Sequence, residues 1–577
     1  MNFYAPEAQI RYLLLVAGLG GLLYGIDVGI IAGALPYLEA SAAQLWKLSA
    51  QQLGFVVAAV LLGSVLSSLA AGALADFLGR KRLMLLAGAL FSLSIPLIAL
   101  ADGYLPLLFG RLLQGVSGGL IGVVVPLYLA ECLPAAVRGR GTAMFQLLLT
   151  IGLVLAAAIG LFVAREVDEV ARHAPTTLPA VQDAAWRRIF WLSLAPGLLF
   201  TAGAAFLAES PRWLLARGRT HDAIHALRRT RPADDARREL AAIASEQAPG
   251  TSAARGSLLQ RHYVLPFLLA CLILACNQAT GINSVLAYAV TILDQGGLAG
   301  SLANAGDFAL KLVNALMTIL AVMLVDRKGR KFLLMLGSGG IVVGLVAAGL
   351  LFRAAESEQA DVQAALVSRI HANALQLDAR ALSALARNDF YQLELAYSYG
   401  PLTQVRTLRP GQSLQITPPT EVDGDSVIGA VFRRMHLNPF HDMKEALRSP
   451  LQIERARLGP PPRAERGWLL LACLLVFMAS FAVGPGVCVW LALSELMPTP
   501  IRSNGMSIAL LVNQFVSTII AAIFLPTVGQ HGYAPMFFTW AGCTVVYFLA
   551  ATFLLPETRG KTLEEIGEHF APAASRR

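Results

Sequence analysis

Twelve long apolar segments dominate the sequence, and each is long enough to cross a bilayer as a helix that rises about 1.5 Å per residue. Hydrophobic residues make up 56% of the chain and charged residues only 14%, a balance that excludes an ordinary soluble enzyme. The sequence therefore predicts an all-α membrane protein with twelve transmembrane helices. The predicted spans are 11–36, 50–75, 83–101, 106–131, 141–164, 188–208, 264–293, 304–325, 332–353, 467–496, 502–528 and 532–555.

Basic residues gather in the short connections that follow the second, fourth and eighth spans. Because positive charge favours cytoplasmic loops, this distribution predicts that both termini are cytoplasmic. We expect a multi-pass protein of the plasma membrane, which in a bacterium is the inner membrane. The formal net charge of +9 then indicates loop placement rather than a nucleic-acid partner. The expected partners are the lipid bilayer and a small molecule, and the chain is expected to act as a monomer.

Two motifs occur twice, which indicates that the chain consists of two related halves. ADFLGRKR at 75–82 returns as VDRKGRK at 325–331, and ECLPAAVRGRG from Glu131 returns as ELMPTPIRSNG from Glu495. Parallel six-helix repeats are a transporter architecture. The wider separation of the second pair places an insertion in the second half. The predicted parts are an N-terminal bundle at 1–208, a cytoplasmic linker with short helices at 209–262, a C-terminal bundle at 263–353 and 467–556, an external insertion at 354–466 and a cytoplasmic tail at 557–577.

The insertion has no apolar run long enough to span a membrane, and topology places it outside, between the ninth and tenth spans. The apolar spacing at 354–387 predicts helix, whereas the later part, at 391–432, has a strand-like pattern bounded by Pro and Gly. We predict a small folded domain that covers the outer mouth together with an enlarged loop at about 165–186. A disordered insertion is the alternative.

The first span carries a carboxylate, Asp27, inside the apolar, Gly-rich stretch from Gly20 to Ala34. A charged carboxylate there costs roughly 3 kcal/mol on insertion scales. Asp27 is therefore either an acid that holds two helices together or a proton site. The sequence shows no nucleophile with a positioned base and no phosphate-binding loop, and its six cysteines lack metal-ligand spacing. Neither an enzyme with catalytic residues nor a metal protein is predicted.

Eight motifs, in order along the chain, resemble the sugar porter family of the major facilitator superfamily. They are GIDVGIIAGA, DFLGRKR, RLLQGVSGGL leading to PLYLAE and RGRG, AESPRWLLARGR, NQATGIN, DRKGRK, SELMPTPIR and PETRGKTLEEI. The resemblance implies the major facilitator fold of two six-helix bundles and transport by alternating access. It covers the chain except the insertion and the loop at about 165–186.

The resemblance implies a coupling pair and a substrate site. In proton-coupled members of the family the first-helix Asp pairs with an Arg early in the fourth helix, here Asp27 and Arg111. Side-chain amides and aromatic rings suit a ligand with many hydroxyls. The matching positions are Tyr24, Gln146, Asn277, Gln278, Asn283, Tyr288, Asn314, Trp490 and Asn513. For each isolated amide, helix-to-helix bonding is the alternative.

Three positions depart from the family pattern, and they favour a larger sugar, a polyol or an acidic sugar over a simple hexose or pentose. Asn277 is shorter than the usual Gln, Ala287 replaces a Tyr, and Gln514 replaces a Trp. These changes predict an enlarged cavity. Lys311, three residues before Asn314, is a candidate anion contact. Its alternatives are a pair with Asp307 and extension of its stem to the outer interface.

Opposite charges at the inner helix ends form the third group of candidate residues. Breaking such pairs when the inside opens would separate two conformational states. The predicted gating residues are Asp76, Arg80, Glu131, Arg138, Glu209, Arg212, Asp326, Arg330, Glu495 and Arg502. The chain is thus predicted to be a proton-coupled symporter of a sugar or sugar-like polyol, with the proton as coupling ion and no cofactor. The alternatives are a proton-independent facilitator and a sugar sensor that does not transport.

Overall fold

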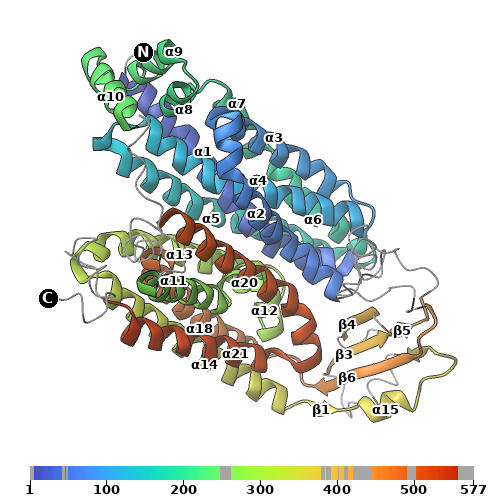
Figure 1. The fold of residues 1–577 in the computed structure, drawn as a ribbon. Coiled ribbons are helices and arrows are strands. Elements are labelled where there is room, and N and C mark those ends of the chain that lie inside the picture. Colours follow the sequence, from blue (N-terminus) through green and yellow to red (C-terminus); the bar gives the residue numbers. More distant parts are fainter. Residues whose placement is uncertain are drawn as a thin grey trace.

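The computed structural model describes residues 6–41, 46, 48, 50–246, 261–378, 384, 391–400, 402–408, 413–419, 445, 447–489 and 502–556. Twelve helical segments in this part are long and apolar enough to cross a membrane, as the sequence predicts. Two helical bundles lie side by side, with short linker helices at one end and a β-sheet at the other (Figure 1). We call these ends the linker face and the sheet face.

The first bundle contains the helices up to residue 205. They are α1 (Pro6–Ser41), α2 (Ala50–Leu78), α3 (Arg80–Ala99), α4 (Tyr104–Cys132), α5 (Ala135–His173), α6 (Leu178–Leu192) and α7 (Leu194–Ala205), with a 3₁₀ turn at Pro175–Thr177 before α6. Glycines let α1 and α5 touch along their backbones. A Cβ atom on Gly25 would lie 1.9 Å from the Leu149 carbonyl oxygen, and one on Gly21 would lie 2.2 Å from that of Phe145. Only glycine permits this approach.

The second bundle begins after three short linker helices. These are α8 (Pro211–Ala216), α9 (Thr220–Arg228) and α10 (Ala233–Glu246). The bundle consists of α11 (Arg261–Ala279), α12 (Ile282–Gly296), α13 (Ser301–Lys328), α14 (Arg330–Ser357), α18 (Ala464–Val483), α20 (Arg502–His531) and α21 (Tyr533–Leu549), continued by a π-helical turn at Ala550–Leu554.

Gly281 breaks the seventh span into α11 and α12, at the position where the sequence allows a break. Its φ of +82° is in the left-handed region that favours glycine. A Cβ atom there would lie 2.4 Å from the Trp540 ring. The break therefore depends both on the backbone angle and on the space that Trp540 leaves.

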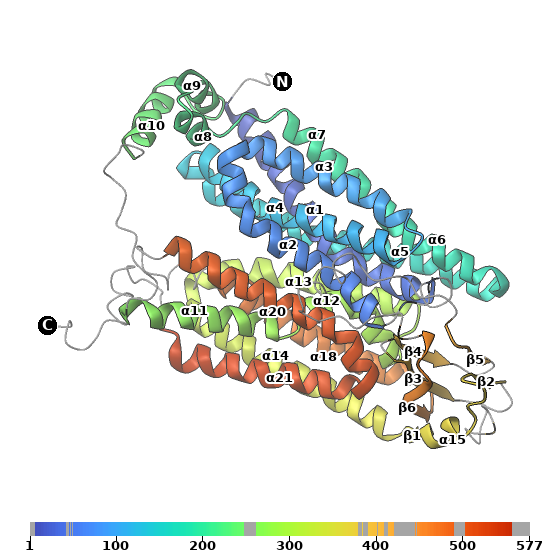
Figure 2. The same ribbon diagram turned by 45° about the vertical axis from the view of Figure 1, so that its right-hand side comes forward.

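The insertion forms a sheet domain between α14 and α18. Strands β1 (Ala360–Asp361), β6 (Leu451–Gly459), β3 (Gln392–Tyr399) and β4 (Leu402–Leu408) form an antiparallel sheet in that order, and β2 (Leu375–Leu377) pairs with β5 (Leu414–Ile416). Leu366 on the short helix α15 (Gln363–Val367) packs with Leu395, Tyr399 and Leu458 in a core of its own. The sheet lies at the opposite end of the bundles from α8–α10 (Figure 2).

Two local predictions are wrong. Residues 354–387 are not one helix, because α14 ends at Ser357 and the apolar side chains that follow are shared between α15 and β2, where Leu375 and Leu377 face the sheet-domain core. The region at about 165–186 is not a long loop. The helix α5 continues to His173, with Val163 and Val167 packed in the core, and α6 begins at Leu178. The strand-like prediction is confirmed for β3, β4 and β5, whereas residues 420–432 lie outside the described part.

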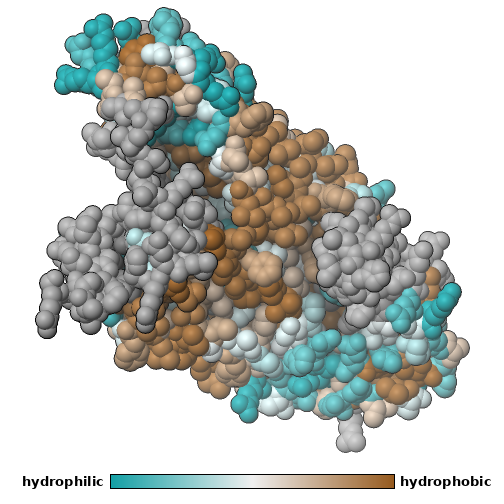
Figure 3. Space-filling model, in the orientation of Figure 1, coloured by the Kyte–Doolittle hydropathy of each residue, from teal (hydrophilic) through white to brown (hydrophobic). Residues whose placement is uncertain are grey.

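A broad apolar surface runs across both bundles between the polar linker helices and the polar surface of the sheet domain (Figure 3). Leu and Phe side chains are exposed on both bundles, among them Leu66, Leu199, Leu265 and Phe515. An apolar surface of this extent is typical of a protein that faces lipid.

Candidate substrate and coupling site

Asp27 is buried near the middle of α1. Its side chain is 1% exposed, and its Oδ1 atom has no hydrogen-bond partner among the described residues. The other oxygen, Oδ2, faces α4, because a Cβ atom on Gly118 would lie 2.5 Å from it. Tyr24, one turn earlier on α1, borders the same glycine at 3.4 Å. Few groups around Asp27 could compensate a negative charge on its carboxylate.

Arg111, the predicted partner, is equally buried on α4. No direct ion pair joins the two side chains in the described structure. Instead, Nη1 of Arg111 donates a 2.6 Å hydrogen bond to Oε1 of Gln114, and the guanidinium lies 5.6 Å from the centre of the Phe190 ring. The predicted pair is therefore brought into the same bundle interior but is separated in this conformation.

A polar network joins α11, α12 and α20 in the second bundle. Nε2 of Gln278 donates to Oδ1 of Asn513 at 3.1 Å, and Nδ2 of Asn283 donates to Oε1 of Gln278 at 2.9 Å and to Oγ of Ser517 at 2.6 Å. Nδ2 of Asn513 in turn donates to the Leu274 carbonyl at 3.0 Å. The break at Gly281 brings Gln278 and Asn283 together. Gln278 and Asn283 are only half buried.

The remaining predicted contacts differ in exposure. Tyr288 is buried, stacks on Phe524 at 4.4 Å between ring centres, and donates to the Ala521 carbonyl. Asn277 is buried, and its Oδ1 has no partner among the described residues. Asn314 is half buried and Gln146 is exposed. Trp490 lies outside the described residues.

Lys311 is fully buried and pairs with Asp307, as the structural alternative for this lysine predicts. Its Nζ atom lies 2.7 Å from Oδ2 of Asp307 and donates a 3.0 Å hydrogen bond to the Gly29 carbonyl. Because Gly29 is on α1, this bond joins the two bundles. The Lys311–Gly29 bond lies nearer to the sheet face than Asp27 does on α1 and Asn314 does on α13. The Asp168 carboxylate on α5 adds a second link by accepting from the Ser301 amide of α13 at 2.8 Å.

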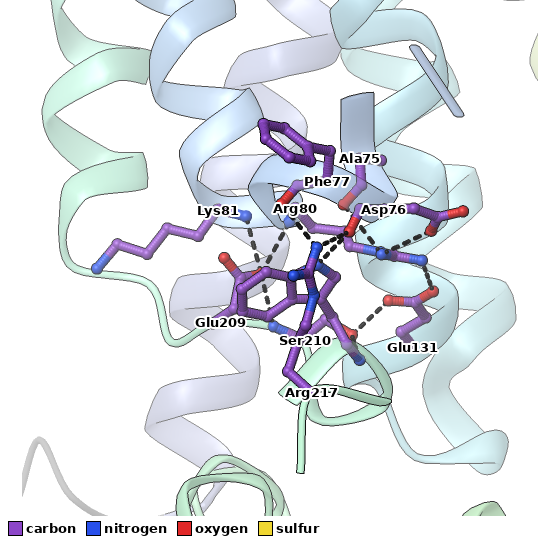
Figure 4. A network of polar contacts seen from close by, with 10 residues as sticks. Ala75, Asp76, Phe77, Arg80, Lys81, Glu131, Glu209, Ser210 and Arg217 are labelled. Carbon is purple, nitrogen blue, oxygen red and sulfur yellow. Dashed lines mark hydrogen bonds and ion pairs between the residues drawn. The ribbon is translucent and has the colours of Figure 1, made fainter. Parts of the chain in front are cut away.

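A compact charge network ties α2, α3 and α4 to the segment before α8 at the linker face (Figure 4). Arg80 lies 3.0 Å from Asp76 and 2.9 Å from Glu131. The second oxygen of Glu131 accepts from the Ser210 hydroxyl. Glu209 accepts from the backbone amides of Arg80 at 2.9 Å and Lys81 at 3.0 Å. Glu209 thus contacts the start of α3 through backbone amides, and its gating role stays a prediction.

Several predicted gating contacts fall outside the description. Glu131 binds Arg80 and Ser210, whereas the side chain of Arg138, its predicted partner, is not described. The side chains of Asp326 and Arg502 and the whole of Glu495 are likewise outside the described part. Arg212 is the second residue of α8, and Arg330 is the first residue of α14.

The sequence analysis missed three residues that the geometry places in these groups. Gln114 and Phe190 hold Arg111, and Ser517 completes the amide network. Helical spacing could have found two of them, because Gln114 is three residues after Arg111 and Ser517 is four after Asn513. Phe190 contacts Arg111 from another helix, and no local spacing signals that contact.

Twelve apolar helices in two bundles, with buried charges and amides between them, define a membrane transporter rather than an enzyme. The family model described as "Sugar (and other) transporter" matches residues 13–371 and 461–570. The chain belongs to this sugar porter family of the major facilitator superfamily.

Known proteins agree with this assignment. The chain is 27% identical over 558 residues to the putative metabolite transport protein YwtG of Bacillus subtilis, and the alignment covers 96% of this chain and 94% of that protein. It is 28% identical over 582 residues to the human proton myo-inositol cotransporter, and this alignment covers 98% of this chain and 82% of that protein. The inward open xylose transporter XylE from E. coli has the same fold, with a TM-score of 0.65, 20% identity, and coverage of 97% of this chain and 100% of that one.

Proposed function

We propose that the chain is a proton-coupled symporter that moves a neutral sugar or sugar-like polyol by alternating access. The observation that carries the proposal is the burial of Asp27 without a hydrogen-bond partner on Oδ1 or a direct ion pair to Arg111. Leaving a charge unpaired in an apolar helix interior is costly, so we infer that Asp27 holds a proton in this conformation. No cofactor beyond the proton takes part, and the chain acts as a monomer.

Movement of Arg111 relative to Asp27 would load and release that proton. A carboxylate beside a guanidinium is stable as an anion, whereas one without such a partner in apolar surroundings is stable in its neutral form. Arg111 is held away by Gln114 and Phe190 in this conformation. A shift of α4 against α1, together with a change in the Arg111 side-chain conformation that breaks its bond to Gln114 on the same helix, would bring the guanidinium to Asp27 and release the proton.

The substrate would bind between the bundles, against the network of Gln278, Asn283 and Asn513. Amide groups donate and accept at once, which fits neighbouring hydroxyl groups of a sugar. A neutral substrate is favoured over an acidic one because the charge of Lys311 is already matched by Asp307. The relative described as a proton myo-inositol cotransporter supports both the coupling ion and a polyol-like substrate.

The orientation follows from the basic residues at the linker face, where Lys81, Arg82 and Arg327 lie. We propose that this face is cytoplasmic and that the sheet domain is external, in the inner membrane of a bacterium. The two inter-bundle bonds on the sheet-face side would then hold the outer half closed.

The test uses proteoliposomes in which a proton gradient drives uptake of radiolabelled sugars. Asp27→Asn is expected to abolish accumulation against the sugar gradient, while exchange of sugar between the two sides persists. Asp102→Asn, which removes an exposed carboxylate on the sheet-face side of the first bundle, is the matched control and should accumulate normally.

Two outcomes would reject the proposal in favour of its alternatives. Accumulation by Asp27→Asn equal to that of the unaltered protein, or the absence of any proton-driven accumulation by the unaltered protein with exchange intact, would indicate a facilitator. Sugar binding without exchange would indicate a sensor.

A further inference from the structure

A hollow lies between the sheet domain and the sheet-face ends of both bundles. The hollow has a cavity volume of about 160 Å³ and opens to solvent at its mouth. Its polar lining comes from three parts of the molecule: Glu39 of α1, Thr291 of α12, Tyr533 of α21, Gln404 and Arg406 of β4, and Arg455 of β6. The hollow is therefore separate from the Gln278 network.

Three of the lining residues carry buried polar atoms without a hydrogen-bond partner in the described structure. They are Oε1 of Glu39, Oγ1 of Thr291 and Nε of Arg455. A buried polar atom left unpaired costs about 1–3 kcal/mol, so native proteins rarely keep several side by side unless something else binds them. Together they offer a carboxylate acceptor, a hydroxyl that donates and accepts, and a guanidinium donor.

The charge and shape of the lining define the ligand. Two acids, Glu39 and Glu394, are balanced by two bases, Arg406 and Arg455, so the hollow has no excess charge for an ion. The half-buried ring of Tyr533 and the side chain of Leu525 provide apolar surface beside these polar atoms. Several hydroxyls on an apolar ring match this combination of groups.

We propose that this hollow is a second binding site, for a small neutral molecule with several hydroxyl groups. A molecule in it touches α1 of the first bundle, α12 of the second and the sheet domain at once. Binding therefore favours the conformation in which the sheet-face ends are together. The site is distinct from the transport site, and the proposal does not depend on proton coupling.

The sheet domain allows a local measurement of occupancy. Thr407 on β4 lines the hollow and is half buried, so a cysteine placed there by Thr407→Cys reports access. The full-length Thr407→Cys protein in nanodiscs is treated with a hydrophilic maleimide at rising concentrations of D-glucose, D-xylose or myo-inositol. The unaltered protein measures background from its own cysteines, which are buried or half buried. We expect at least one probe to slow the labelling in a saturable way, whereas glycine betaine does not.

Second substitutions then assign the protection to one site. Thr291→Val removes a hydroxyl that binds nothing in the described protein, so it should leave the fold intact and raise the half-protecting concentration about 2- to 10-fold, the value of one lost hydrogen bond. Gln295→Leu, also in the lining, should act in the same direction. Gln376→Leu, an exposed amide of the same domain, and Gln278→Leu in the transport network should leave the half-protecting concentration unchanged.

Three results would overturn the proposal. Protection by none of the probes would mean that the hollow holds only water. Protection that Gln278→Leu removes and that Thr291→Val and Gln295→Leu leave unchanged would mean that the transport site is responsible. Equal protection by glycine betaine would mean a general osmotic effect.

Discussion

The ammonium group of Lys311 on α13 donates a 3.0 Å hydrogen bond to the backbone carbonyl of Gly29 on α1. This bond joins the two bundles two residues beyond Asp27, and the same ammonium lies 2.7 Å from Asp307. A lysine that supports both an ion pair and a bond between bundles has a structural role at the closed sheet-face half. Its substitution is therefore expected to affect stability more than substrate choice.

Lys311→Met should lower the free energy of unfolding by about 3–5 kcal/mol, because it leaves Asp307 buried without a compensating charge. The double variant Lys311→Met with Asp307→Asn should recover much of this loss. Thermal inactivation in detergent measures both effects. Lys328→Met, on the exposed end of the same helix, is the control and should change little. If Lys311 instead contacts an acidic sugar, Lys311→Met will remove competition by anionic sugars and leave competition by neutral ones.

Asn513→Leu should weaken substrate binding and raise KM about tenfold or more, because Gln278 loses its acceptor and the Leu274 carbonyl loses its donor. Ser517→Ala removes only the bond from Asn283 and should raise KM less. Initial rates of sugar exchange give KM for each variant. Gln376→Leu is the amide control in the sheet domain. An unchanged KM in Asn513→Leu would show that the network only joins helices.

Gly281→Ala should destabilise the second bundle by about 1–3 kcal/mol, since alanine is strained at positive φ and its Cβ meets the Trp540 ring. Gly542→Ala is a matched control, because no atom lies within 4 Å of the position a Cβ would take there. That control should be neutral or slightly stabilising, by up to about 1 kcal/mol, as alanine favours a helix over glycine. Equal thermal stability of the two variants would contradict the importance of the break.

The sheet domain should become less stable as pH rises above the ordinary range of a carboxyl. Burial raises the pKa of Glu394 above its usual value of 4.5, although Arg455 partly opposes the shift. A raised pKa in the folded state means that the folded domain holds the proton more tightly, so this stabilising contribution is complete below about pH 4.5 and is lost as pH passes the raised pKa. Protease resistance of the domain as a function of pH measures the effect.

Glu394→Gln should remove that part of the pH dependence, whereas Glu454→Gln, an exposed carboxyl on β6, should keep it. Glu358 provides a contrast of opposite sign, because hydrogen bonding to Arg466 lowers its pKa. A pH profile that is identical in Glu394→Gln and the unaltered protein would show that Glu394 does not carry the effect.

The helices could be predicted from the sequence because an apolar run of bilayer length has only one stable form in a membrane. The break at Gly281 could be anticipated for the same kind of local reason, since glycine adopts that backbone angle with little strain. The helix beyond residue 165 could not, because its polar residues extend past the apolar span and are supported by contacts that distant residues make. Asp168, for example, binds the Ser301 amide of α13.

The sequence indicated which residues to expect in the candidate site, but not which side chains they bind. The motifs identified Asp27, Arg111, Gln278 and Asn283, but a motif carries no information on conformation. Whether Arg111 binds Asp27 or Gln114 depends on how α4 lies against its neighbours. The hollow at the sheet face was not predictable either, because its lining comes from eight separate helices and strands, and nothing in any one of them signals a binding site.

The antiparallel pairing of β1 with β6 has a consequence for the order in which the chain folds. Asp361 follows α14 directly, yet its partner Arg457 comes almost a hundred residues later, just before α18. The sheet cannot close during synthesis until that whole segment has been made and has reached the side of the membrane on which the domain folds. Until then β3 and β4 can form only a hairpin, with the edge that β6 later covers left open. Insertion of α18 and completion of the sheet therefore follow each other closely. If insertion of α18 is delayed, the open edge of the β3–β4 hairpin stays exposed and can pair with a wrong strand.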